Sequence, residues 1–231
     1  MNKKIAVIGM GHFGIHLAIG LAKKGADVLA IDDSLDRLDE VKDQVTHTVR
    51  LDATEETPLR SQGLEEFDAV VVAIGDNFEA SLLTVAMLQK VGVNRIIVRA
   101  TTAVHERILE HLGVKEIILP AAEAAERLAN SLLFENVLDS YALSSDYTIA
   151  EVTVPDGFIG RTVEELDLQK RFEISLVTIK RMGKKSELFG LRKKEVETIL
   201  GVPQPGTRVE RGDILVVFGA KQAIQRLTEA E

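Results

Sequence analysis

The sequence contains no cysteine and no tryptophan, and only 4% of its 231 residues are aromatic. Without cysteine the chain can form neither disulfides nor thiolate metal sites. The scarcity of aromatic side chains argues against a surface on which nucleic-acid bases would stack. The formal charge of −8 at pH 7 also excludes the basic overall surface that is typical of nucleic-acid-binding proteins, so we expect no nucleic-acid partner.

Long apolar runs are absent as well. No segment approaches the roughly 20 apolar residues that a helix needs to cross a bilayer. The apolar segment at residues 5–8 is shorter than the central region of a signal peptide. We therefore expect a cytoplasmic protein. Hydrophobic residues still make up 45% of the chain, which is enough to bury a sizeable core.

Short apolar segments alternate with helical patterns over the first 120 residues, which is typical of a parallel α/β sheet. The predicted helices include one that runs from the residue after Gly11 to Lys24 and one over 35–42. The predicted strands are 5–8, 28–31, 46–51, 69–74, 96–98 and 116–119. This succession predicts a complete Rossmann-like, doubly wound sheet, and we assign residues 1–120 to a nucleotide-binding domain.

The sequence changes character after Pro120. Apolar residues at helical spacing predict an amphipathic helix over about 121–138, and the polar segment 140–146 is the best candidate for a linker. We expect residues 147–231 to form a small α+β domain. Its predicted strands are 147–154, 174–179 and 214–218, and its predicted short helices are 163–168 and 222–229.

The segment Gly9-Met10-Gly11-His12-Phe13-Gly14 matches the G-x-G-x-x-G fingerprint at the junction of the first strand and the first helix. Its glycines permit a tight turn, the approach of a pyrophosphate and close packing of helix on strand. Asp32 ends the second strand at nearly the spacing of about 20 residues that the fingerprint requires. A carboxylate there accepts the ribose hydroxyls of adenosine and disfavours a 2′-phosphate. The alternative is a helix cap, a role that Asp33 or Ser34 could also fill.

Two further polar loops, at residues 52–54 and 75–77, follow the carboxyl ends of the third and fourth predicted strands, where the ligands of such sheets bind. Helix capping is the alternative role for both loops. Arg99 follows the fifth strand and is either a cation for the phosphates or an ordinary surface arginine. The candidate nucleotide-binding residues are therefore Gly9, Met10, Gly11, His12, Phe13, Gly14, Asp32, Asp33, Asp52, Ala53, Thr54, Ala73, Ile74, Gly75, Asn77 and Arg99.

An ordered set of motifs resembles the Ktr/Trk-type regulators of bacterial potassium transport, which contain RCK (KTN) domains. The matching segments are IGMGHFG (8–14), AID (30–32), LDAT (51–54), VAIG (72–75), NVLD (136–139) and GRTVEELDL (160–168). The resemblance covers essentially the whole chain. It implies a Rossmann domain, a crossover helix within 121–140 that dimerises neighbouring chains, and an RCK C-terminal subdomain.

The same resemblance implies a function. Members of this family form a homo-oligomeric, typically octameric, ring that docks on a membrane-embedded potassium-translocating subunit at the inner face of the cell membrane. Adenine nucleotides change the shape of the ring and so gate the transporter. ATP and ADP fit this expectation better than NAD or NADH do. The resemblance therefore implies a regulatory subunit rather than an enzyme.

Three positions refine what the resemblance implies. His12 stands where Ktr-type members usually carry an arginine for the terminal phosphate of ATP, so we expect weaker discrimination between ATP and ADP. Pro120-Ala121 replaces a Pro-Glu pair that supplies a metal-binding carboxylate in some members, and we expect no divalent ion there. Some members bind cyclic di-AMP in the C-terminal subdomain, and the comparable segment here contains Asp167, Arg171 and Ile174.

Two other classes of protein share the glycine fingerprint. An NAD-dependent oxidoreductase needs an acid–base group facing the nicotinamide and a substrate pocket in its second domain, whereas all five histidines fall in the first domain, where we expect them to be solvated or locally bonded. An NAD(H) redox sensor stays open as an alternative. A DNA-binding regulator needs a helix-turn-helix with a basic face, and the basic segments 184–185 and 192–194 suit a solvated loop better.

Overall fold

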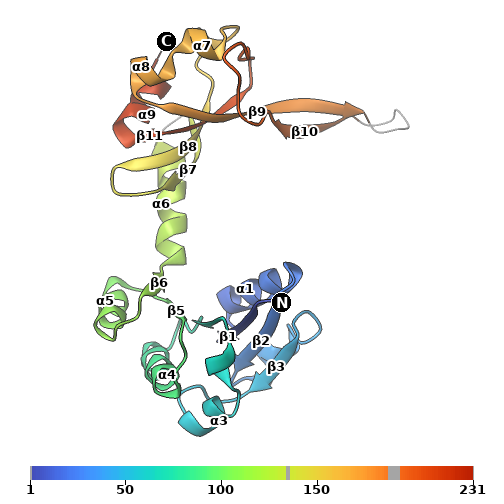
Figure 1. Ribbon diagram of the computed structural model, residues 1–231, viewed down its shortest axis with the longest axis vertical. Coiled ribbons are helices and arrows are strands. Elements are labelled where there is room, and N and C mark those ends of the chain that lie inside the picture. The colour runs from blue at the N-terminus through green and yellow to red at the C-terminus, as the bar shows by residue number, and fades with distance from the viewer. Residues whose placement is uncertain (1, 134–135, 187–192, 231) are drawn as a thin grey trace. The chain divides into compact units, whose positions relative to one another are not determined.

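The computed structural model describes residues 2–133, 136–186 and 193–230, which form two compact units, Met1–Ala121 and Ala122–Glu231 (Figure 1). We describe each unit by itself. Within the described part of the chain, no helix combines the length and the apolar character that crossing a membrane requires.

The first unit contains a six-stranded parallel sheet with the strand order β3-β2-β1-β4-β5-β6. Its strands are β1 (Lys4–Ile8), β2 (Asp27–Asp32), β3 (His47–Arg50), β4 (Ala69–Val72), β5 (Ile96–Arg99) and β6 (Glu116–Ile118). The order reverses between β1 and β4, so the carboxyl ends of these strands border the position where doubly wound sheets bind their ligands. The predicted Rossmann-like fold is confirmed.

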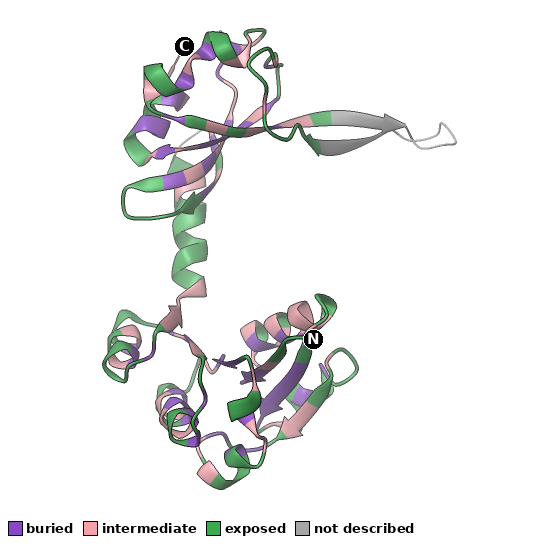
Figure 2. Cartoon of the chain, viewed as in Figure 1, coloured by how far each residue is buried: buried purple, intermediate pink, exposed green. Residues whose placement is uncertain are grey.

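The central strands of this sheet are buried on both faces, as continuous apolar segments predict. In β4 all four residues are buried, and Figure 2 shows the same for most of β1 and β2. Alternate residues point to opposite faces: Ala6 and Ile8 belong to one hydrophobic cluster, whereas Val7 belongs to the other. The connecting helices are α1 (His12–Lys23), α2 (Leu35–Asp39), α3 (Glu56–Arg60), α4 (Phe78–Val91) and α5 (Ala103–His111).

The second unit contains a five-stranded antiparallel sheet with the order β10-β9-β11-β8-β7. Its strands are β7 (Val137–Ala142), β8 (Tyr147–Thr153), β9 (Ser175–Ser186), β10 (Lys193–Ile199) and β11 (Ile214–Ala220). The helices α7 (Val163–Leu166), α8 (Leu168–Phe172) and α9 (Lys221–Thr228) share a hydrophobic core with this sheet. The predicted α+β character of the C-terminal subdomain is confirmed.

The segment between the two sheets differs from the sequence-based prediction. The helix α6 (Pro120–Leu133) was expected to reach Leu138, but β7 begins at Val137. The linker expected at 140–146 is instead the end of β7 and its turn into β8. The cause is tertiary pairing, because Val137 pairs with Val152 and Ser140 with Ala150 in the neighbouring strand. Such pairing overrides a helical spacing of apolar residues.

Candidate nucleotide-binding site

The glycine loop between β1 and α1 has a separate reason for each of its glycines. Gly9 has φ = 95°, in the left-handed region that favours glycine. A Cβ atom on Gly14 would lie 1.9 Å from the carbonyl oxygen of Gly9, so only glycine lets α1 approach β1 so closely. A Cβ atom on Gly11, by contrast, would meet nothing within 4 Å. The space beside Gly11, at the amino-terminal end of α1, is therefore not filled by other protein atoms. A phosphate group would bind in this space.

Asp32 connects this loop to the start of α2. Its carboxylate is 5% exposed, and it accepts hydrogen bonds from the backbone N–H of Met10 at 2.6 Å and of Ser34 at 2.9 Å. The guanidinium of Arg37 lies 3.6 Å from the same carboxylate. Ser34 rather than Asp32 occupies the N-cap position of α2. Because each carboxylate oxygen can accept more than one hydrogen bond, capacity remains for the hydroxyls of a ribose.

The other two polar loops are partly occupied by local hydrogen bonds. Asp52 accepts from both the backbone N–H and the hydroxyl of Thr54, at 2.9 and 2.6 Å, and these bonds lower the pKa of Asp52. Asn77 caps α4 by accepting from the N–H of Ala80 at 3.0 Å. The capping role that the sequence left open is therefore realised at Asn77.

Four further candidates around these loops differ in accessibility. Ala53 and Ala73 are buried, at 7% and 2% exposed, so their side chains support the loops by packing in the interior. Ile74 is half-buried, and a Cβ atom on Gly9 would lie 3.0 Å from its Cγ1 atom. Asp33 is exposed, and its backbone carbonyl accepts a hydrogen bond from Arg50 at 2.8 Å.

Arg99 brings the loops after β1 and β4 together. Its guanidinium carbon lies 5.4 Å from the centre of the Phe13 ring. Its Nη1 atom lies only 2.8 Å from the position that a Cβ atom on Gly75 would occupy. Among the residues that the structure describes, no carboxylate pairs with Arg99. The sequence proposed Arg99 as a phosphate ligand, but it could not predict these contacts with Phe13 and Gly75.

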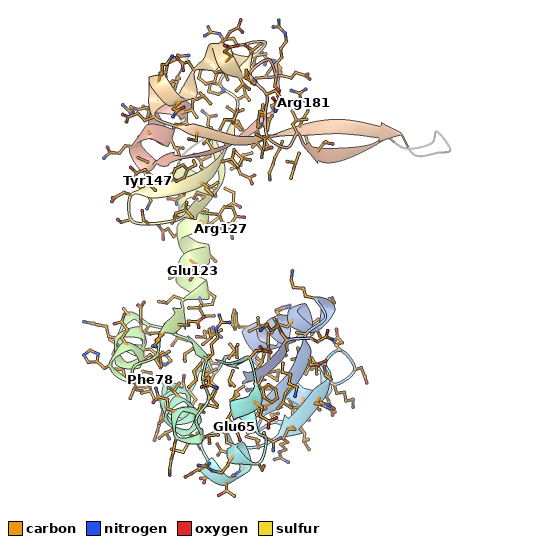
Figure 3. All side chains as sticks on the ribbon, in the orientation of Figure 1. Glu65, Phe78, Glu123, Arg127, Tyr147 and Arg181 are labelled. Carbon is orange, nitrogen blue, oxygen red and sulfur yellow. The ribbon has the colours of Figure 1, made fainter. Side chains whose placement is uncertain are left out.

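The histidines behave differently from one another. His12 is exposed at the start of α1, and His111 bonds locally to the carbonyl of Arg107 at 2.6 Å. His105 is 0% exposed, and neither of its ring nitrogens has a hydrogen-bond partner among the described residues. Its ring packs edge-on against Phe78, 4.8 Å away, and burial lowers the pKa of His105 (Phe78 is labelled in Figure 3). The expectation of solvated or locally bonded histidines is wrong for this residue.

The candidate cyclic di-AMP residues are not all accessible. Asp167 adopts φ = 42° between α7 and α8 and pairs with Lys170 at 3.5 Å. Arg171 is exposed, and its guanidinium lies over the ring of Phe172 at 5.1 Å. Ile174 is 1% exposed and belongs to the core of the second unit. A role for Ile174 beside an adenine base therefore stays a prediction, and in this conformation its side chain packs in the core.

The helix α6 presents an apolar surface that the second unit does not cover. None of its described residues is buried, and Leu128, Leu132 and Leu133 are 60%, 75% and 75% exposed (Figure 2). Its polar side is fastened to β7, where Arg127 donates two hydrogen bonds to Asp139, at 3.1 and 2.7 Å (Arg127 is labelled in Figure 3). We call the three exposed leucines the leucine stripe.

Metal binding has no obvious site in the described ranges, where no group of three or more His, Asp or Glu side chains is arranged to hold an ion. Glu123 is exposed in the first turn of α6 (Figure 3).

Comparison with known proteins identifies the family. Residues 5–120 match the TrkA-N domain, and residues 149–230 match the TrkA-C domain. The chain is 34% identical to the Ktr system potassium uptake protein C of Bacillus subtilis over 98% of its own length and 96% of that protein. The chain belongs to the Ktr/Trk family of potassium uptake proteins. The Ktr system potassium uptake protein A of Bacillus subtilis is 32% identical to it, over 97% of this chain and 95% of that one.

Solved structures support the same fold for this Ktr/Trk family member. The RCK domain of GsuK aligns with 100% of the chain at a TM-score of 0.65 and 16% identity, and the chain spans 48% of its length. The GsuK channel bound to NAD aligns equally well, with a TM-score of 0.65 and 17% identity, over 100% of this chain and 40% of that one. These likenesses confirm a Rossmann-type nucleotide-binding fold followed by an RCK C-terminal subdomain. Both relatives from Bacillus subtilis are potassium uptake proteins of the Ktr system.

Proposed function

We propose that this protein is the nucleotide-sensing regulatory subunit of a potassium uptake system. The observation that carries the nucleotide part is the open space at Gly11, which lies at the amino-terminal end of α1. Backbone N–H groups and the helix dipole stabilise a phosphate at such a position. Asp32 would bind the ribose of the same ligand, and its negative charge disfavours a 2′-phosphate, so NADP is the least suitable nucleotide.

The ligand class we propose is an adenine nucleotide, with ATP and ADP ahead of NAD and NADH. GsuK has been seen with NAD, in a chain of only 17% identity, so that ligand is a property of GsuK. The protein acts as a sensor and not as an enzyme in this proposal. Cyclic di-AMP is left out of it, because Ile174 lies in the core of the second unit.

Gating requires that the nucleotide favour one conformation of the assembly. A ligand shifts a conformational equilibrium only by its difference in affinity for the two states, so equal affinity would gate nothing. We propose that the assembly is a homo-oligomeric ring, octameric as the resemblance implies, with α6 as the dimerising element. The exposed leucine stripe supports this self-association. The ring would act at the inner face of the cell membrane through a membrane-embedded potassium-translocating subunit.

Isothermal titration of the nucleotide-free, full-length protein with ATP, ADP, AMP, NAD and NADH tests the sensor. We expect saturable binding of ATP and ADP. Replacing Asp32 by alanine should weaken all adenine nucleotides about tenfold or more, because hydrogen bonds to a charged group contribute about 1.5–3 kcal/mol each. The matched control is Asp36→Ala, at an exposed aspartate in the first turn of α2.

Each outcome of the titration has a clear meaning. Unchanged affinities in a folded Asp32→Ala variant would show that the cleft is wrongly assigned. Selective binding of NAD or NADH, with turnover of the cofactor, would replace the sensor by an oxidoreductase. Co-expression with a potassium-translocating subunit in a bacterium deficient in potassium uptake tests the regulatory part, through growth at limiting potassium with and without this chain.

A further inference from the structure

We infer that Gly75 and Phe13 form a seat for the guanidinium of Arg99, and that Arg99 held in this seat recognises the second phosphate of the bound nucleotide. The inference rests on the proposed nucleotide-binding function. It also extends that function. One side chain, held in place by two other residues, would distinguish nucleoside monophosphates from nucleotides that carry a phosphate chain.

The contact between Arg99 and Gly75 explains why residue 75 has no side chain. A Cβ atom on Gly75 would lie 2.8 Å from Nη1, 3.3 Å from Cζ and 3.5 Å from Nη2 of Arg99. Three guanidinium atoms therefore lie against this glycine. Gly75 is not among the residues with positive φ, so its backbone conformation would also suit alanine. A side chain at this position would therefore displace the guanidinium of Arg99 from its observed place.

Phe13 provides the second side of the seat. Its ring belongs to the glycine loop at the start of α1, and the centre of the ring lies 5.4 Å from Cζ of Arg99, within the range of a cation–π contact. Gly75 follows β4 and Arg99 ends β5. The guanidinium therefore lies between two loops that both border the carboxyl edge of the sheet, one of which is the glycine loop that contains Gly11.

The charges at this edge favour a phosphate as the partner of Arg99. Arg99 brings a positive charge to this edge, and no carboxylate among the described residues pairs with it. An arginine presents its N–H groups as a planar fork that binds phosphate oxygens at two points. The amino-terminal end of α1 would hold the first phosphate, and the seated guanidinium would then hold the second.

The experiment compares ADP with AMP, in titrations of the full-length protein. We expect ADP to bind more tightly than AMP. Arg99→Ala should lower the affinity for ADP about tenfold and leave that for AMP within about twofold, and Arg99→Lys should restore part of the difference. The control is Arg95→Ala, which removes the same charge from an exposed arginine that pairs with Glu116 at 2.7 Å. This control should leave the ratio of ADP to AMP affinity unchanged.

Gly75→Ala tests the seat itself. Only the flexible end of Arg99 has to move to make room for the new methyl group, so the fold should tolerate it. We expect this variant to lose part of the preference for ADP, and to lose nothing further when Arg99 is already alanine. Gly20→Ala is the control, because a Cβ atom on Gly20 meets nothing within 4 Å. Circular dichroism confirms that each variant is folded.

The failure of this inference can be told apart from failure of the proposed function. If Arg99→Ala binds ADP and AMP with the wild-type ratio, the inference is wrong while nucleotide sensing stands. If Gly75→Ala weakens ADP equally with and without Arg99, the glycine contacts the nucleotide directly and there is no seat. If the wild-type protein binds none of the nucleotides, the proposed function itself is overturned.

Discussion

Each of the two units buries an aspartate, and the two carboxylates differ in their hydrogen-bonding and cationic partners. Asp213, in the second unit, is 1% exposed and receives two hydrogen bonds of 2.7 Å from Arg181 and one of 2.8 Å from the N–H of Glu210. Asp32, in the first unit, is 5% exposed and receives two backbone hydrogen bonds, while its nearest cation, Arg37, stays at 3.6 Å.

The difference separates a structural group from a binding group. A buried charge is tolerated when it is paired and hydrogen-bonded, and Asp213 has a cationic partner and accepts three hydrogen bonds within its own unit. Asp32 keeps capacity for further hydrogen bonds at the edge of the sheet where ligands bind. A buried carboxylate with an incomplete set of partners is therefore a better indicator of a binding site than burial alone.

The largest effect on stability should come from removing the charge of Asp213, which pairs with Arg181. Asp213→Asn leaves Arg181 with only the exposed carboxylate of Glu210 as its ionic partner among the described residues. It should lower the free energy of unfolding by about 2–3 kcal/mol, slightly below the usual range for buried pairs because Arg181 is partly exposed and keeps this second partner. Urea unfolding measures the loss. Asp156→Asn is the control, since this aspartate is largely exposed and pairs only with an exposed arginine. An equal, small loss in both variants would contradict a structural role for Asp213.

A smaller loss of stability is expected at Asp32. Asp32→Asn weakens the acceptor for the N–H groups of Met10 and Ser34 and should cost about 1–2 kcal/mol. The same variant should lose the rise in melting temperature that ADP gives the wild-type protein, because a ligand stabilises the state that it binds. Thermal unfolding with and without ADP measures both. The comparison breaks down if Asp32→Asn retains the full shift produced by ADP.

The smallest effect concerns His105, a buried group whose ring nitrogens have no hydrogen-bond partner in the described part of the chain. Burial lowers the pKa of His105, so the folded protein stays neutral there while the unfolded chain takes up a proton below about pH 6.5. The stability that this neutral histidine allows is present above that pH and is lost as the pH falls toward the lowered value. His105→Leu should make stability less dependent on pH below about 6.5. Urea unfolding between pH 5 and 8 provides the measurement.

Much of the first unit could be predicted from the sequence because its signals are local. A continuous apolar segment such as β4 has one common explanation, a strand covered on both faces. The glycine loop and Asp32 stand at spacings that a single physical arrangement requires. The second unit is harder, since β7 is a half-exposed strand whose pairing with β8 decides its structure.

Other features depend on contacts between residues far apart in the chain. The seat for Arg99 brings together residues 13, 75 and 99, and no spacing in the sequence predicts this contact. The burial of Ile174 and of His105 likewise depends on which elements pack against them. Sequence patterns indicated the residue types that suit a nucleotide, whereas only the three-dimensional arrangement shows which side chains have partners and which are free to act.

The proposed self-association through the leucine stripe on α6 would make protein concentration a thermodynamic variable. The polar side of α6 is fastened by Arg127 and Asp139, so the helix cannot turn its leucines inward without losing those hydrogen bonds. In a solitary chain that apolar area stays in contact with water. Any second copy that covers it adds its own free energy to the folded state by mass action, and dilution removes that contribution. The melting temperature of this protein should therefore be reported together with the concentration at which it was measured.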